Sequence, residues 1–117
     1  MDDVLTALRA EFEADEGSFL LLIRIELDWD RAAFTRLERA MRAVCETSQQ
    51  RDELPRWLAE GYYYMSHFVA EWTSHPHFPR PEPADYYNDC LERLRDLSDW
   101  FFRGVHGYLE PHVWAEL

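Results

Sequence analysis

The sequence predicts an all-α fold: a single-domain bundle of four or five helices, with an extended Pro-rich connector before the last long helix. Three observations support this prediction. The chain has 117 residues, of which 47% are hydrophobic, and this suits one packed domain. Three long segments repeat their apolar residues with the period of an α-helix. Four of the six prolines lie within residues 75–83, where they prevent a continuous helix.

The N-terminal segment predicts a short helix. Asp2 and Asp3 are residue types that cap helices, and Gly17 is placed to end the helix. The apolar positions between them follow a helical period; they are Val4, Leu5, Leu8 and Phe12.

Residues 18–27 carry two patterns at once. The alternation from Ile23 to Leu27 is typical of a strand, whereas the spacing of Phe19, Leu20, Ile23 and Leu27 is typical of a helix. We favour a helix, because a single strand would leave its backbone groups without a partner in this chain. If the segment is a strand instead, it would pair with another chain.

Three long helices follow. Asp28 or Asp30 can cap the first, which extends to about Thr47. Asp52 can cap the second, with Pro55 in its first turn and an end near Ser74. The third runs from about Ala84 to Gly104.

The segment after Gly104 is too short and too interrupted for another long helix. We expect its apolar side chains to pack back onto the bundle; they are Tyr108, Leu109, Val113 and Trp114.

The second long helix has an unusual apolar arc. At 100° per residue this arc contains Leu54, Trp57, Leu58, Gly61, Met65, Phe68, Val69 and Trp72. A glycine inside a helix costs about 1 kcal/mol relative to alanine, so Gly61 predicts the close approach of another helix or a ligand. Tyr62 and Tyr64 flank the arc, and Tyr63 points away from it.

The charge excludes some functions. The net charge is −11, which repels nucleic acid phosphates, and all twelve basic side chains are arginines. Arg31, Arg39 and Arg42 share the outward side of their helix, and we expect them to pair with acidic neighbours such as Glu38 or Glu46. The acidic N-terminus is not a secretory signal, and no apolar run is long enough to span a membrane.

Cys45 and Cys90 lie on the apolar sides of separate predicted helices. Two isolated cysteines favour buried thiols in a reducing cytosol over a disulfide, so the sequence predicts a cytoplasmic protein.

Histidines and a glutamate form a stripe at the end of the second long helix. His67, Glu71 and His75 are spaced i, i+4 and i+8, and His77 follows. Imidazole and carboxylate are ordinary metal ligands. However, i and i+8 are about 12 Å apart along a helix, and no second ligand motif appears. We therefore expect no metal and no cofactor, with a metal site at His67, Glu71 and His75 as the alternative.

The connector sequence "PHFPRP" contains P-x-x-P followed by arginine, which is the pattern of a polyproline ligand. We interpret it instead as a stiff connector that places Phe78 in the core.

The sequence favours a cytosolic interaction or adaptor protein without catalytic activity. An acidic, aromatic-rich bundle suits binding to a basic protein partner. Bacterial immunity proteins and antitoxins are an analogy that rests on size and charge alone. The expected partners include no nucleic acid and no membrane, and the chain would be a monomer or homodimer. The candidate interaction residues are Tyr63, His67, Glu71, Trp72, His77 and Phe78. The alternative is a small-ligand or metal-binding bundle, with or without enzymatic activity, centred on Tyr64, His67, Glu71 and His75.

Overall fold

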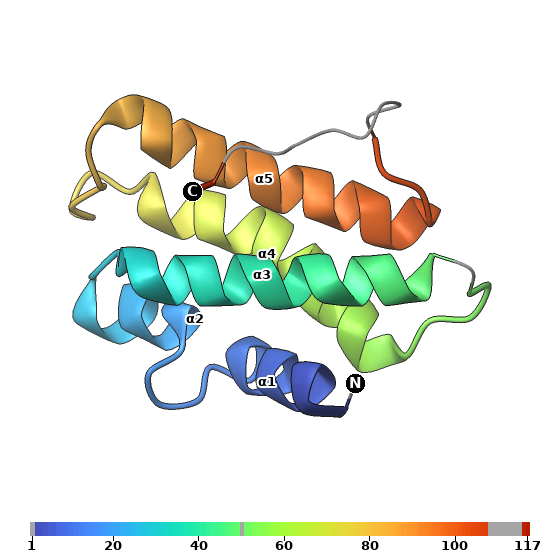
Figure 1. The fold of residues 1–117 in the computed structure, drawn as a ribbon. Coiled ribbons are helices and arrows are strands. Elements are labelled where there is room, and N and C mark those ends of the chain that lie inside the picture. The colour runs from blue at the N-terminus through green and yellow to red at the C-terminus, as the bar shows by residue number, and fades with distance from the viewer. Residues whose placement is uncertain (1, 50, 108–115) are drawn as a thin grey trace.

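The computed structural model describes residues 2–49, 51–107 and 116–117, and every regular element among them is helical (Figure 1). The all-α prediction is therefore confirmed. The elements are α1 (Asp2–Phe12), α2 (Phe19–Leu21), the π-helical turn η1 (Leu22–Glu26), α3 (Arg31–Ser48), α4 (Arg56–Thr73) and α5 (Ala84–Arg103). The predicted packing of Tyr108, Leu109, Val113 and Trp114 lies outside the described residues.

Helix α3 lies at the centre of the bundle (Figure 1). Helix α1 packs against α3, and α5 packs against both α3 and α4. The α2–η1 segment lies beside α1 and the start of α3. Trp29 follows η1 and joins these layers, because its ring contacts Phe19, Phe34 and two tyrosines of α5.

The segment at residues 18–27 is helical, as favoured, and the strand alternative is wrong. Ser18 caps α2 by accepting a hydrogen bond from the Leu21 amide at 3.2 Å. The helix then widens into the π-helical turn η1, which the sequence did not predict. Leu27 ends this turn with a left-handed φ of 52°, and its amide bonds to the Leu22 carbonyl.

Two helix ends differ from the prediction. Gly17 does not end α1; Ala14 takes the left-handed position at φ 58°, and the Asp15 amide bonds to the Ala10 carbonyl. Asp52 does not cap α4, which begins at Arg56 with Pro55 as the preceding residue. The reason is that a proline disfavours helical conformation in the residue before it. The predicted cap at Asp30 is confirmed, because its carboxylate accepts from the Ala33 amide at 3.0 Å.

The predicted connector links α4 to α5, and its first part folds as a turn. The Phe78 amide donates to the His75 carbonyl at 2.9 Å, and the His77 amide donates to Nδ1 of His75 at 3.2 Å. Phe78 is buried, as the sequence analysis expected. Helix α5 then ends at Gly104, which is left-handed with φ 78°.

Gly61 permits the predicted close approach, and the neighbour is Phe12 of α1. A Cβ placed on Gly61 would lie 2.0 Å from Cδ2 of the Phe12 ring. The same ring makes edge-on contacts with Trp57 and Tyr62. Gly61 therefore lets an aromatic side chain of α1 sit directly on the backbone of α4.

The buried face of α4 is turned relative to the predicted arc. Tyr62, expected on the flank, is fully buried. Its hydroxyl donates to the Met41 carbonyl at 2.7 Å, and its ring stacks on Phe101 at 4.1 Å. Trp72, expected in the core, is instead 38% exposed. Tyr63 is 60% exposed and points outward as predicted.

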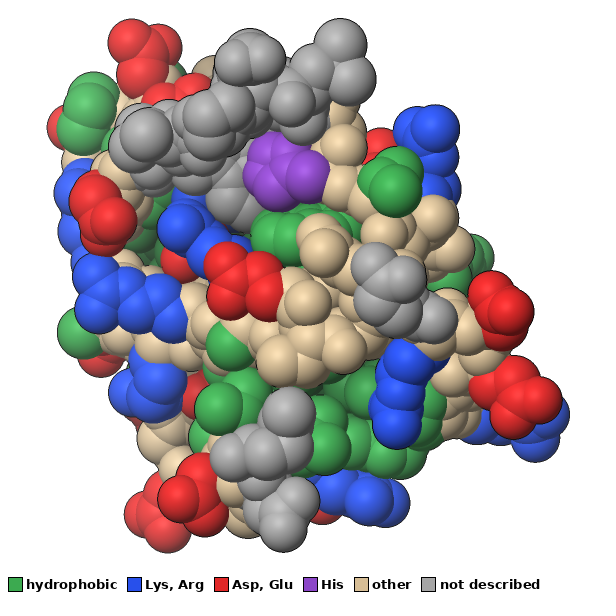
Figure 2. All heavy atoms as spheres, turned by 45° about the vertical axis from the view of Figure 1, so that its right-hand side comes forward, with side chains coloured by type: hydrophobic (Ala, Val, Ile, Leu, Met, Phe, Trp, Pro, Cys, Tyr) green, Lys and Arg blue, Asp and Glu red, His purple; other side chains and the backbone are tan. Residues whose placement is uncertain are grey.

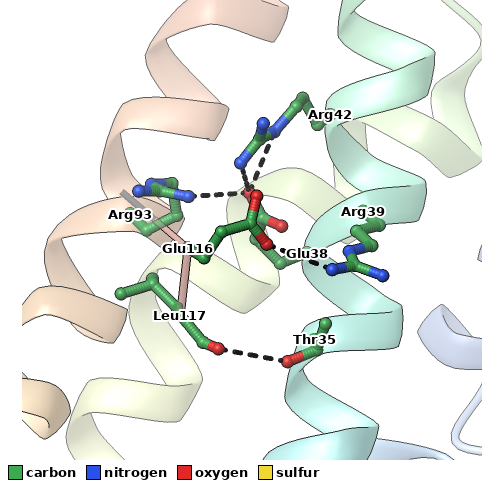
Figure 3. Close-up of polar contacts among 7 residues, drawn as sticks. All are labelled: Thr35, Glu38, Arg39, Arg42, Arg93, Glu116 and Leu117. Carbon is green, nitrogen blue, oxygen red and sulfur yellow. Dashed lines mark hydrogen bonds and ion pairs between the residues drawn. The ribbon is translucent and has the colours of Figure 1, made fainter. Parts of the chain in front are cut away.

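A buried ion-pair cluster joins α3 to α5 (Figure 3). The Glu38 carboxylate lies 2.6 Å from Arg42 of its own helix and 2.9 Å from Arg93 of α5. Glu38 and Arg93 are both buried. Arg42 thus pairs with Glu38 as predicted, whereas Arg39 pairs with Glu116 and Arg31 lies over the Tyr86 ring.

A second buried carboxylate, Glu11, connects three elements. It accepts a hydrogen bond from the Phe19 amide at the start of α2 and pairs with Arg36 of α3 at 2.8 Å. Acceptors are favourable at a helix N-terminus, where the first amides have no partner within the helix.

Cys45 and Cys90 are both buried free thiols, as predicted. Burial raises the pKa of Cys45 to about 12 and that of Cys90 to about 11. In the part of the chain that the structure describes, no helix is both long enough and apolar enough to cross a membrane.

Candidate interaction surface

Three aromatic rings form a ladder along the exposed side of α4. Tyr64 stacks on Phe68 with ring centroids 4.8 Å apart, and Phe68 stacks on Trp72 at 5.5 Å. Their spacing of i, i+4 and i+8 places them on one side of the helix. The ladder is exposed at both ends, since Tyr64 is 39% and Trp72 is 38% accessible.

The η1 segment and Leu27 after it carry exposed apolar side chains, and Leu27 lines a hollow together with Trp72 of the ladder. Ile25 is 65% exposed and Leu27 is 40% exposed. The indole of Trp72 holds the segment to α4 by donating to the Ile23 carbonyl at 2.7 Å. We call Tyr64, Phe68, Trp72, Ile25 and Leu27 together the aromatic face.

Exposed hydrophobic residues are concentrated in this region. Of the seven large hydrophobic side chains exposed in the described part of the chain, five lie on α4 or at positions 25–27. Single exposed hydrophobic residues are ordinary on protein surfaces, but a contiguous group typically marks a binding site.

A small apolar hollow lies at the Trp72 end of the aromatic face. It has a volume of about 240 Å³ and is lined by Leu27, Trp72, His75, His77 and Phe78. The turn at residues 75–78 forms this hollow because it folds the two histidines back toward Trp72, with their rings 5.2 Å apart. We call it the Trp72 hollow.

A larger hollow lies at the Tyr64 end, between α1, the α2–η1 segment and α4. Its volume is about 590 Å³, and its lining includes Phe12, Arg24, Trp57, Tyr63 and Tyr64. The contact between Phe12 and Gly61 brings α1 close to α4 at this place. We call it the α1–α4 hollow.

The charges around the aromatic face are mainly acidic. Within residues 24–28 and 60–72 the charged side chains are Arg24, Glu26, Asp28, Glu60 and Glu71, and all five are exposed. The formal charge of these two segments is therefore −3, from four carboxylates and one guanidinium.

Five of the six predicted interaction residues fall into two groups. Trp72, His77 and Phe78 meet at the Trp72 hollow. Tyr63 and His67 stack with ring centroids 4.3 Å apart, and Tyr63 borders the α1–α4 hollow. Glu71 is exposed on α4 between these groups and belongs to the acidic surroundings of the aromatic face.

The alternative metal set is not gathered into one site. His67 Nδ1 lies 3.1 Å from the Tyr63 carbonyl, and His75 Nδ1 accepts the His77 amide. Among the residues that the structure describes, no group of three or more His, Cys, Asp or Glu side chains has an arrangement able to hold a metal ion.

Four contributors to the surface were not predicted from the sequence: Ile25, Leu27, Tyr64 as part of a ladder, and Phe68. Ile25 and Leu27 alternate with Arg24, Glu26 and Asp28, which is the pattern that also resembled a strand. The signal for an exposed apolar edge was present there, but the pattern was used only to choose between a helix and a strand.

Another apolar surface lies at the opposite end of α4. Figure 2 views the bundle obliquely from the side on which α3 ends and α4 begins, and it shows hydrophobic side chains among arginines and carboxylates. A hollow of about 200 Å³ opens there, with Leu5, Val44, Trp57 and Leu58 in its lining. It lacks the stacked rings of the aromatic face, which is therefore the stronger candidate.

Comparison with known proteins gives no relative from which a function can be transferred: the chain matches no protein-family model, no curated protein and no solved structure.

Proposed function

We propose that this chain is a binding protein whose aromatic face docks onto a basic protein partner. The observation that carries the proposal is the stacked Tyr64–Phe68–Trp72 ladder, which is exposed at both ends and has Leu27 beside Trp72. Four exposed carboxylates lie on the two segments that form this face. Aromatic side chains are enriched in the energetically dominant parts of protein interfaces, where nearby charges set specificity and association rate.

The charge supports a basic partner over a second copy of the same chain. In a symmetric dimer the same patch meets itself, so a local charge of −3 would face another −3 across the interface. A partner that carries arginine or lysine around an apolar ridge would pair with Glu26, Asp28, Glu60 and Glu71 instead.

The test compares the parent with a face variant and a matched control. The face variant is Ile25→Ser with Tyr64→Ser, at two exposed positions whose side chains make no hydrogen bond described in the structure. The control is Phe102→Ser, a hydrophobic side chain that is 46% exposed on α5. Proteins retained by the immobilised parent are purified, and the binding of each is measured by calorimetry at low and high salt.

We expect a basic partner whose affinity falls at least about tenfold in the face variant, is unchanged in the control and weakens with salt. A partner that binds the parent and the face variant equally would show that the aromatic face is not the docking site. Salt-independent binding would contradict the electrostatic part of the proposal.

A further inference from the structure

We propose that the aromatic face receives a basic amphipathic helix, with one apolar anchor in each of its two hollows. This inference rests on the proposed function and specifies the form of the partner. The proposed function alone would also allow an extended peptide or a flat protein surface as the partner.

The two hollows lie at the two ends of the aromatic ladder. The α1–α4 hollow is lined by Gly61 and Tyr64, and the Trp72 hollow is lined by Trp72 and His75. From Gly61 to Trp72 the distance along α4 is roughly 16 Å, at 1.5 Å for each of eleven residues. A partner helix would span this distance with anchors at positions i and i+11 on one side.

Both hollows have α4 as one wall and the segment from α2 to Leu27 as another, through Leu20 and Arg24 at one end and Leu27 at the other. Residues of α1 complete the lining of the α1–α4 hollow, and the turn at residues 75–78 completes that of the Trp72 hollow. The bond from Trp72 to the Ile23 carbonyl fixes the spacing of these walls. A helix that lies nearly parallel to α4 can therefore contact both walls along its length.

Phe68 of α4 stacks between Tyr64 and Trp72. Ile25 is exposed on η1 and lies in sequence between Arg24, which lines the α1–α4 hollow, and Leu27, which lines the Trp72 hollow. Anchors at i+4 and i+7 of the partner would rest on these side chains, which gives the i, i+4, i+7, i+11 pattern of helices that bind in grooves. Basic residues on the flanks of the partner helix would meet Glu60 and Glu71 on one side and Glu26 and Asp28 on the other.

The test uses designed peptides of about sixteen residues with the full 117-residue protein. The first peptide carries leucines at i, i+4, i+7 and i+11 with lysine and alanine elsewhere. A second has the same composition with the leucines moved out of helical spacing, and a third carries a central proline that breaks the helix. Binding is measured by fluorescence anisotropy, and helix formation by circular dichroism.

We expect the first peptide to bind and become helical, and the other two to bind at least about tenfold more weakly. In the protein, the substitution Leu27→Asn should weaken the binding of the first peptide by a similar factor. Asparagine tolerates the left-handed φ of 52° at this position, so the substitution removes a wall of the Trp72 hollow while keeping the turn.

A double-mutant cycle identifies which anchor fills which hollow. Leu27→Asn should be non-additive with alanine at one terminal anchor of the peptide and additive with alanine at the other, whichever way the helix points. Phe102→Ser serves as the control and should leave the affinity of every peptide unchanged.

Equal binding of the helical and proline-containing peptides, or no binding of the helical peptide, would overturn this inference. In either case the proposed function would stand if the purified basic partner still loses affinity for the Ile25→Ser, Tyr64→Ser variant. If the Ile25→Ser, Tyr64→Ser variant still binds both the basic partner and the first peptide as the parent does, the inference and the proposed function would both be overturned.

Discussion

The indole N–H of Trp72 donates a 2.7 Å hydrogen bond to the backbone carbonyl of Ile23, across 49 residues of sequence. The last carbonyls of a helix lack partners within the helix, and here a side chain of α4 supplies one. This bond makes the position of η1 depend on α4. It also means that Trp72 has a structural role in addition to its place on the surface.

Trp72→Phe should separate these two roles. Phenylalanine keeps an aromatic ring in the ladder but cannot donate to Ile23, so we expect a loss of about 1–2 kcal/mol in the free energy of unfolding. Amide hydrogen exchange should accelerate at residues 22–28 more than in α3 or α5. Uniform acceleration throughout the chain would contradict a local role for this hydrogen bond.

Gly61→Ala should destabilise the fold although alanine is the better helix former. The added Cβ would meet the Phe12 ring at 2.0 Å, so the ring must leave its contacts with Trp57 and Tyr62. We expect a net loss of about 1–3 kcal/mol by chemical denaturation.

The Phe12→Ala background is the control for this substitution. There the clash is removed, and Gly61→Ala should become neutral or stabilising by up to about 1 kcal/mol. An equal loss in both backgrounds would mean that Phe12 is not the obstacle.

Glu38→Ala should be one of the more damaging single substitutions on α3. It takes a carboxylate away from the buried Arg93 and from Arg42, and we expect a loss of about 3–5 kcal/mol in thermal or urea unfolding. Arg39→Ala removes an exposed pair with Glu116 and should cost less than about 1 kcal/mol.

Replacing both buried partners tests whether the cost comes from the isolated charge. The double variant Glu38→Leu, Arg93→Met should recover most of the stability lost in Glu38→Ala. If it is as unstable as the single variant, packing rather than charge would dominate at this position.

Stability should fall as the pH rises above about 9. Burial raises the pKa of Cys45 from 9.0 to about 12 and that of Cys90 from 9.0 to about 11. Above pH 9 the unfolded thiols lose protons that the folded ones keep, so the folded state binds more protons and the free energy of unfolding decreases with pH. The stabilisation from the two buried thiols is fully present below pH 9, where the thiols of the unfolded chain are also protonated. It is lost as the pH rises towards about 11 and about 12, the pKa values of Cys90 and Cys45 in the folded protein.

Urea denaturation between about pH 8 and 10 measures this slope. In the double variant Cys45→Ala, Cys90→Ala the free energy of unfolding should depend less steeply on pH. Some decrease should remain above pH 10, because burial raises the pKa of Tyr86 from 10.0 to about 12. The same burial should make both thiols slow to alkylate in the native protein. Rapid labelling under native conditions would show that the thiols are accessible.

Local signals sufficed for elements whose ends are set by neighbouring residues. Helix α5 was predicted from Ala84 to Gly104 and is found from Ala84 to Arg103, because prolines precede it and a left-handed glycine follows it. The cap at Asp30 was predicted for the same kind of reason. At α4, two local signals competed, and the conformational restriction imposed by Pro55 outweighed the capping potential of Asp52.

Features that depend on distant residues were not predictable in this way. The helical period of 100° per residue could not decide whether Tyr62 or Trp72 is buried. The burial of Tyr62 depends on its contacts with Phe12 of α1 and Phe101 of α5. Glu38 was expected to pair at the surface, yet Arg93, 55 residues away, pairs with it in the interior. The Trp72 hollow likewise needs Leu27 and the turn at residues 75–78 to meet.

The two buried carboxylates find their partners at different stages of chain synthesis. Glu11 bonds to Phe19 and Arg36, which are 8 and 25 residues away, so its contacts are complete once α3 has been made. Glu38 must wait for Arg93, but Arg42 on its own helix is available at once. As a chain emerges from the ribosome N-terminus first, α3 can therefore pack with α1 before α5 exists, without a wholly unpaired charge on its buried side.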